Sequence, residues 1–163
     1  MTDWDINQTS FSSEQKKILL VLTKFKNEIE ESELSDIEED YLEIEKEIRK
    51  SLSKVSDDAI PLAISILKPL VKNNDRSAAI LLGLIGDHTI LSILIEYTST
   101  FDNDDGCDAE IAEIMELAFW RMEKKAVPEL IHGLEIAIKG DSIARGKTEI
   151  TRRSITGALG SIA

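Results

Sequence analysis

The feature that most constrains the fold is an apolar run, RSAAILLGLIGD, at residues 76–87. A related run, RSITGALGSIA, returns at residues 153–163, and the two match at a constant offset of 77 residues, as Arg76 and Arg153 show. A helix that is apolar on nearly every side must be covered on several faces. Each run is therefore predicted to form an inner helix packed between others.

The spacing of apolar residues and the capping signals predict helices in the rest of the chain as well. Ser12 and Gln15 have the spacing of a capping box that opens a helix, and Ser35 and Glu38 repeat that spacing. An apolar stripe with intervals of three and four then marks one long helix: Ile37, Tyr41, Ile44, Ile48, Leu52 and Val55.

Turn signals divide the remainder into shorter helices, expected at about 59–72, 75–86, 89–101, 108–124, 126–139 and 148–162. No alternating segment is long enough to argue for a sheet, so the predicted fold class is all-α.

Several residues that disfavour helices lie within the expected ones. Pro61 and Pro128 fall in first turns, where the missing N–H removes no helical bond, but Pro69 should kink or end its helix near Lys68. Because glycine is costly inside a helix, Gly83 and its counterpart at 160 are expected to permit the close approach of a neighbouring helix.

Short motifs repeat across the second part of the chain. AIPLAISIL at 59–67 matches AVPELIHGL at 126–134. The pairs Asp75-Arg76, Ala78-Ala79 and Leu82-Gly83, followed by Ile85-Gly86-Asp87 and a second helix, resemble the HEAT-type repeats of the armadillo superfamily.

This resemblance implies a short HEAT-like α-α superhelix of stacked antiparallel helix pairs over residues 59–163. An acidic helical pair at residues 12–55, which does not match the repeats, precedes it within a single domain, 1–163. Uneven repeat lengths leave the number of repeats open. The last apolar run ends the sequence without the second helix that its pattern predicts. Either the last helix packs back fully against the stack, or a partner covers its free face, or the given chain is shortened.

Charge restricts the class of partner. The chain has 31 acidic and 19 basic side chains, a net charge of −12 and a pI near 4.6. Such a surface repels phosphate backbones and anionic lipids, so neither nucleic acid nor a membrane is an expected partner, whereas a basic protein is attracted.

The acidic charge is densest between residues 28 and 47, where eleven carboxylates accompany one basic residue, Lys46. The block is interpreted either as a solvated helix face or as a docking surface for a basic protein. An acidic loop at 102–108 could extend that surface. The candidate partner-binding residues are Glu28, Glu30, Glu31, Glu33, Asp36, Glu38, Glu39, Asp40, Glu43, Asp102, Asp104, Asp105 and Asp108.

The acidic loop is not predicted to bind metal. An EF-hand loop counted from Asp102 would need glycine at its sixth position, but Gly106 is fifth and Cys107 sixth. Asp108 is instead predicted to be the N-cap of the next helix.

No catalytic constellation is present in the sequence. The acidic neighbours of Cys107, the single cysteine, disfavour the thiolate that a nucleophile needs. His88 is expected at a helix start, and His132 with Glu129 makes one Glu-x-x-His, whereas a di-iron site requires two. The sequence therefore predicts a non-enzyme without cofactor or metal.

Among the aromatic residues, Phe101 and Phe119 are expected in the core, while the adjacent Trp120 must face another direction. One cysteine permits no internal disulfide, and the first residues lack a signal-peptide pattern. The longest apolar run is too short to span a membrane, so the expectation is a soluble, cytoplasmic protein.

The function expected is that of a protein-binding module. Its most concrete form is a cytoplasmic immunity or inhibitor protein that masks a basic, nuclease-like toxin with an acidic surface. The alternatives are a HEAT-like adaptor or scaffold that holds a peptide or subunit in its groove, and a cofactor-handling protein similar to the HEAT-like lyases that attach bilin pigments. The sequence leaves the partner's identity and the oligomeric state open.

Overall fold

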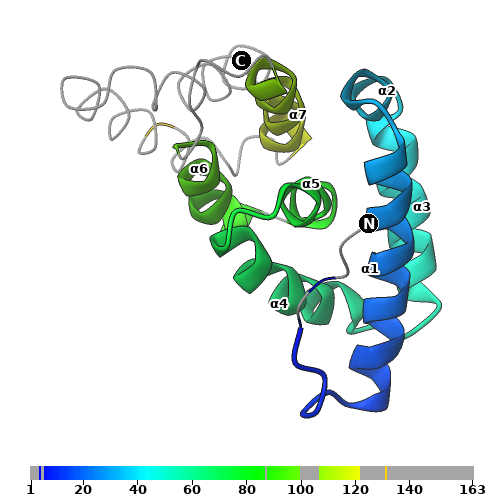
Figure 1. The fold of residues 1–163 in the computed structure, drawn as a ribbon. Coiled ribbons are helices and arrows are strands. Elements are labelled where there is room, and N and C mark those ends of the chain that lie inside the picture. The colour runs from blue at the N-terminus through cyan, green and yellow to red at the C-terminus, as the bar shows by residue number, and fades with distance from the viewer. Residues whose placement is uncertain (1–3, 5, 87, 100–106, 122–130, 132–163) are drawn as a thin grey trace.

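The computed structural model of the protein describes residues 4, 6–86, 88–99, 107–121 and 131. These residues form seven α-helices and one 3-10 helix, with no strand among them (Figure 1). The all-α prediction is thus confirmed for the described part of the chain. In chain order the elements are α1 (Ser13–Glu31), α2 (Leu34–Glu39), α3 (Tyr41–Ser53), α4 (Ala59–Lys72), α5 (Arg76–Ile85), η1 (His88–Ile90), α6 (Leu91–Ser99) and α7 (Cys107–Arg121).

The first capping box is confirmed. The Gln15 N–H donates to Ser12 Oγ over 3.2 Å, and the Ser12 N–H donates to Gln15 Oε1 over 2.8 Å. The capping box predicted at Ser35 is wrong, because α2 already begins at Leu34 and its N-cap, Glu33, makes no side-chain capping bond.

The single long helix expected from residue 35 onward is also divided in two. Asp40 ends α2 and precedes α3 with a backbone (φ −96°, ψ 13°) outside the helical region. Aspartate is a weak helix former, and here it follows two glutamates. The apolar stripe survives the break, since Ile37, Tyr41, Ile48 and Leu52 are buried while Ile44 and Val55 pack partly buried against the core.

Helix α4 has the predicted bounds and continues to Lys72, so of the two expectations for Pro69, a kink or an end near Lys68, the end is wrong. Pro69 and Ser65, whose carbonyl would have accepted the missing N–H, are both exposed. Solvent can replace the lost hydrogen bond there, so the cost of the proline is reduced.

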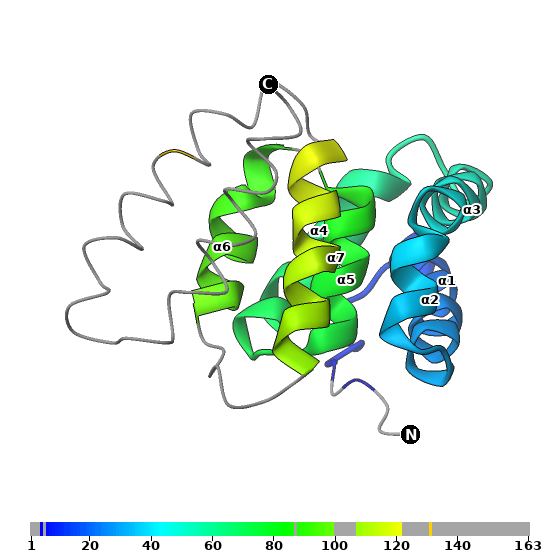
Figure 2. The same ribbon diagram turned by 90° about the horizontal axis from the view of Figure 1, so that it is seen from above.

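Helix α5 lies at the centre of the described fold. Every residue from Ser77 to Gly86 is buried, and α5 packs against α1, α3, α4, α6 and α7. Figures 1 and 2 show α1, α2 and α3 on one side of α5, with α4, α6 and α7 around its other sides. The prediction that the apolar run at 76–87 is covered on several faces is confirmed.

Gly83 permits the close contact expected of it. A Cβ added there would lie 3.0 Å from Ala118 Cβ of α7 and 3.5 Å from the Tyr41 hydroxyl oxygen of α3. Cβ atoms are rarely as close as 3.0 Å, so the absence of a side chain lets α5 pack tightly against α7, whereas the distance to Tyr41 is an ordinary van der Waals contact.

The end of the described region follows the prediction with small shifts. The expected helix at 89–101 begins as the 3-10 turn at His88, and α7 begins at Cys107. Asp108 is therefore the second residue of α7, and its prediction as an N-cap is wrong. Phe119 is fully buried and Trp120 is 40% exposed, which confirms that they face different sides.

Apart from Ile131, which is helical and exposed, the expected helices at 126–139 and 148–162 lie outside the described residues, as do Phe101, His132 and the second apolar run. Among the described helices, none has the length and apolar character that a membrane crossing requires.

Candidate protein-binding surface

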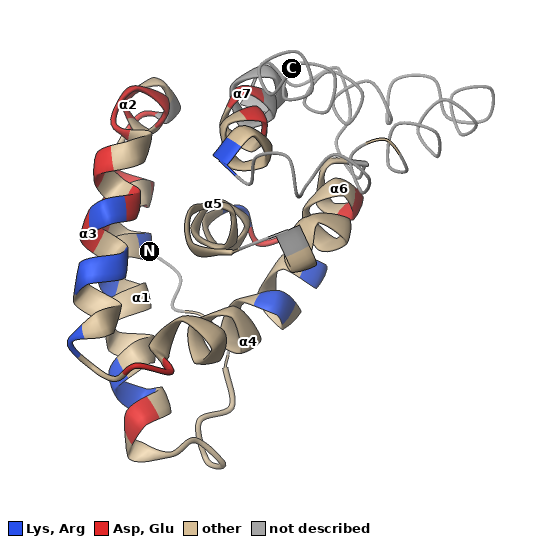
Figure 3. Cartoon of the chain, turned by 180° about the vertical axis from the view of Figure 1, so that it is seen from behind, with Lys and Arg blue, Asp and Glu red and all other residues tan. Residues whose placement is uncertain are grey.

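The turn from α1 through α2 into α3 brings acidic side chains together at one end of the molecule. Figure 3 shows acidic segments over α2 and the adjoining part of α3. We define the acidic surface as the exposed carboxylates of this region that form no ion pair with a described residue: Glu28, Glu31, Glu33, Asp36, Glu39, Asp40 and Glu43.

The acidic surface is not neutralised within the described part of the chain. The ion pairs nearby use other carboxylates: Lys26 pairs with Glu30 at 3.2 Å, and Arg49 and Arg121 approach Glu45 at 3.1 and 3.7 Å. The mutual repulsion of the seven carboxylates therefore persists until an outside cation approaches.

Glu30, a sequence candidate, takes part in internal contacts. Its carboxylate pairs with the buried Lys26 ammonium, and its other contact is the Ser77 hydroxyl, which donates to Glu30 Oε1 over 3.3 Å. Glu30 therefore links α1 to α5. Its position four residues after Lys26 was the signal available in the sequence.

The remaining candidates differ in placement. Glu38 is half-buried, whereas the other acidic residues of α2, Asp36 and Glu39, are exposed. Asp102, Asp104 and Asp105 lie outside the described residues, as does the side chain of Asp108, which belongs to the first turn of α7. The structure thus brings the exposed candidates of 28–43 together and leaves the loop candidates without a described position.

A small cavity of about 160 Å³ opens within the acidic surface. Buried Phe25, Ile29 and Ile37 line it together with half-buried Ile44. Its polar lining comes from Glu28, Ser32 and Asp40. We call this cavity the acidic notch.

Two arginines, Arg49 of α3 and Arg121 of α7, bind the end of α5. The sequence did not predict these contacts. Arg121 Nη2 donates to the Gly83 carbonyl over 2.8 Å and also to the Gly86 carbonyl. Arg49 Nη2 donates to the Ile85 carbonyl over 3.2 Å. Both guanidinium groups approach Glu45 Oε1, so the free carbonyls at the end of α5 are capped by cations from α3 and α7.

The sequence signal for this cap was weak. Helix α5 has no basic residue in its own last turn. Its terminal carbonyls, buried with the rest of the helix, needed donors from elsewhere in the chain.

Tyr41 lies against the same cluster. Its hydroxyl is buried and lies near the Arg121 guanidinium, but it makes no hydrogen bond of good geometry with a described residue. Burial raises the pKa of Tyr41 well above its ordinary value, and the nearby Glu45 carboxylate acts in the same direction against the opposing charge of Arg121. The hydroxyl is thus a neutral part of the core rather than a reactive group.

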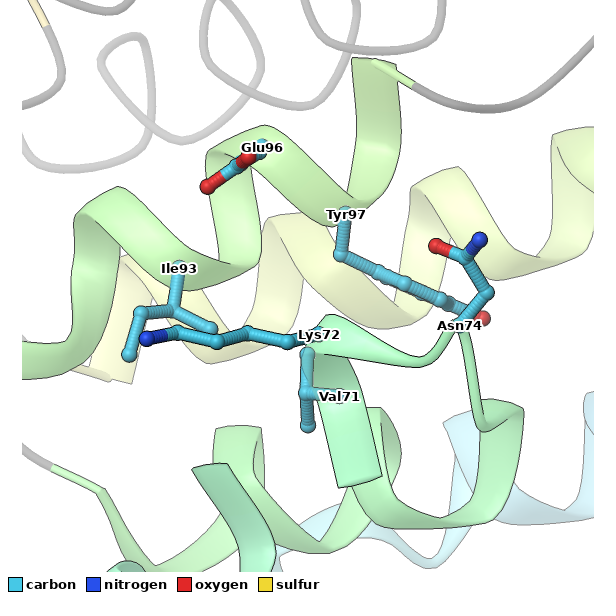
Figure 4. Close-up of a pocket in the computed structure, with 6 residues that line it drawn as sticks. All are labelled: Val71, Lys72, Asn74, Ile93, Glu96 and Tyr97. Carbon is cyan, nitrogen blue, oxygen red and sulfur yellow. The ribbon is translucent and has the colours of Figure 1, made fainter. Parts of the chain in front are cut away.

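A second, larger pocket of about 440 Å³ lies between the end of α4 and α6 (Figure 4). Val71, Lys72 and Asn74 line it from α4 and the following turn, and Ile93, Glu96 and Tyr97 line it from α6. Asn74 has a left-handed backbone with φ 64°, which closes the turn. The volume falls within the range of about 300–1,000 Å³ that small-molecule sites occupy.

The described residues contain no group of three or more metal-ligating side chains close enough together to hold a metal ion. Comparison with protein-family models, curated proteins and solved structures returned no match to this chain. The functional interpretation therefore depends on the geometry and charge described above.

Proposed function

We propose that this chain is a non-enzymatic protein-binding module whose acidic surface docks a basic protein. The observation that carries the proposal is the group of seven exposed carboxylates without a described cation partner. Exposed ion pairs contribute only about 0.2–1 kcal/mol each, so such a surface acts mainly by accelerating association and by selecting a positively charged partner.

The most concrete form of this function is an immunity or inhibitor protein. A nuclease that grips phosphates carries a basic surface, and a carboxylate-rich protein that covers this surface blocks access of nucleic acid. The chain's net charge of −12 suits that role.

A HEAT-like stack is part of the proposal. In this arrangement α4 and α5 form one helix pair, and α6 and α7 contribute to the next. The close packing of consecutive α4 and α5 supports the pairing. The approach of Ala118 in α7 to Gly83 in α5 supports the stacking of one pair on the next.

An adaptor role is the second candidate, favoured by the larger pocket between α4 and α6. That pocket could receive a side chain of a bound peptide or, in a cofactor-handling protein, a small molecule. Native mass spectrometry of the purified protein would distinguish these roles, since a retained small molecule adds a discrete mass.

Charge reversal tests the main proposal. The probe is fluorescein-labelled nona-arginine, and binding to the full chain is followed by fluorescence anisotropy as salt is raised. The triple variant E31K/D36K/E39K should weaken binding about tenfold or more. Its matched control, E47K/D57K/D58K, changes net charge equally at exposed positions outside the acidic surface and should have a markedly smaller effect.

Equal loss in both triple variants would mean that net charge alone attracts the probe. Binding of the unaltered chain that does not weaken with salt would also contradict the proposal, because exposed charges are screened within about 8 Å at physiological ionic strength. Circular dichroism would verify that each variant remains helical.

A further inference from the structure

We infer that the acidic notch receives one arginine or lysine side chain of the basic partner and so anchors the complex. The inference rests on the proposed function and adds the position at which the partner is held.

The size of the notch favours a side chain over a free ligand. Its volume of about 160 Å³ is below the range of about 300–1,000 Å³ typical of small-molecule sites. At roughly 30 Å³ for each water, the notch has room for about five waters. That space suits one long side chain that enters from a docked surface.

The chemistry of the lining selects a cationic side chain with an aliphatic stem. Phe25, Ile29 and Ile37 are at most 4% exposed and form an apolar wall. Lysine and arginine place their methylene groups on such surfaces while the charged end stays near water.

Two carboxylates from different elements border the same cavity. Glu28 comes from α1 and Asp40 from the junction of α2 and α3. Ser32 Oγ donates to the Glu28 carbonyl over 2.8 Å, so its lone pairs remain able to accept from an incoming cation. An anionic side chain would be repelled here, and an apolar one would place its end beside two charges.

A pair of matched double variants separates the notch from the rest of the acidic surface. E28Q/D40N removes both carboxylates that line the notch, whereas E31Q/E39Q removes two exposed carboxylates that do not line it. Asp40 makes no side-chain capping bond, so its change to asparagine leaves the α3 terminus intact. Each pair changes the net charge equally.

The readout is the affinity of the full chain for fluorescein-labelled nona-arginine, measured by anisotropy. We expect E28Q/D40N to weaken binding about tenfold and E31Q/E39Q to weaken it less than about threefold, because a cation seated between two carboxylates and against the apolar wall of the notch is less screened than one on the open surface.

Filling the notch without a charge change provides an independent test. Ser32 is exposed and has an extended backbone (φ −91°, ψ 154°), so a larger side chain is tolerated. S32F and S32A both lose the hydrogen bond to the Glu28 carbonyl, but only phenylalanine occupies the cavity. S32F should weaken nona-arginine binding about tenfold, and S32A less than about twofold.

The outcomes separate the inference from the proposed function. Equal weakening by the two double variants, with S32F binding as S32A does, would overturn the anchor while salt-sensitive docking still stood. Absence of binding by the unaltered chain would overturn both. Greater loss from E28Q/D40N and from S32F than from their controls supports the anchor.

Discussion

The contacts of Arg121 predict a large stability loss when its guanidinium is removed. The side chain is 13% exposed and donates to the Gly83 and Gly86 carbonyls. Methionine at this position keeps an unbranched apolar stem but leaves these carbonyls at the buried end of α5 without their donor.

The expected magnitude follows from these two acceptors. Hydrogen bonds to charged groups contribute about 1.5–3 kcal/mol each, and partial access of water to the carbonyls recovers some of that. Arg49 continues to neutralise Glu45, which limits the loss from the broken ion pair. We therefore expect Arg121→Met to lower the free energy of unfolding by about 2–4 kcal/mol.

Urea denaturation followed by circular dichroism measures this loss. Arg121→Lys retains the charge but not the planar fork, so it should lose about half as much. Arg76→Met removes an exposed arginine from the first turn of α5 and should change stability by no more than about 0.5 kcal/mol. A loss from Arg121→Met as small as that of Arg76→Met would refute the reasoning.

Two further predictions concern the same region. Gly86→Ala should cost about 2–3 kcal/mol in urea denaturation, because the added Cβ would lie 2.4 Å from Ile90 Cγ1 and 2.6 Å from the Leu82 carbonyl oxygen. Gly86 has φ −72°, which any residue can adopt, so the cost comes from these two contacts. A neutral result would contradict the prediction, because Ile90 and the Leu82 backbone would then both shift without cost. Tyr41→Phe should leave stability at neutral pH unchanged or raised by up to about 1 kcal/mol, because the lost hydroxyl makes no hydrogen bond of good geometry with a described residue. Burial raises the pKa of Tyr41, so as pH rises this hydroxyl ionises in the unfolded chain before it ionises in the folded one. The contribution of Tyr41 to the free energy of unfolding is therefore intact below about pH 10. Above that pH it falls by up to about 1.4 kcal/mol per pH unit. Tyr41→Phe should lack this part of the stability loss at alkaline pH. If the free energy of unfolding depends on pH identically in the variant and the unaltered chain, the raised pKa of Tyr41 is contradicted.

Local patterns accounted for much of the fold. The bounds of α4 and the first capping box depend on residues close in sequence, so periodicity and cap chemistry were sufficient. The central position of α5 followed from an apolar composition that leaves no face suited to water. Gly83 was informative because a glycine inside a helix is costly unless packing requires it.

The errors arose where a local rule competed with the surroundings. The spacing of the stripe that begins at Ile37 is continuous, but Asp40 interrupts the backbone without disturbing the stripe. Pro69 continues its helix because the site is exposed.

The candidate site was predictable in composition but not in geometry. The acidic block is visible in sequence, whereas Glu30 differs from the acidic surface through its contacts with Lys26 and with Ser77, 47 residues away. The arginine cap joins residues from three helices, such as Arg121 and Gly83, which are 38 positions apart. Such convergence depends on tertiary packing and has no local signature.

Because the first three helices are packed into the fold, we predict that the acidic surface binds a polycation more tightly than a free peptide of the same sequence does. Helix α1 packs on α4 and α5, and α2 packs on α7, so a partner meets carboxylates on an ordered backbone. A free peptide of residues 28–43 has the same carboxylates but must order its backbone on binding, at about 1–2 kcal/mol per residue fixed. In the folded chain the main ordering cost is that of side chains, about 0.5–1.5 kcal/mol each.

The full chain should therefore bind nona-arginine at least about tenfold more tightly than the 28–43 peptide at equal salt. A scrambled peptide of the same composition is the control for charge alone, and it should match the unscrambled one. If the 28–43 peptide binds as tightly as the folded protein, ordered presentation contributes nothing, and charge density by itself governs the interaction.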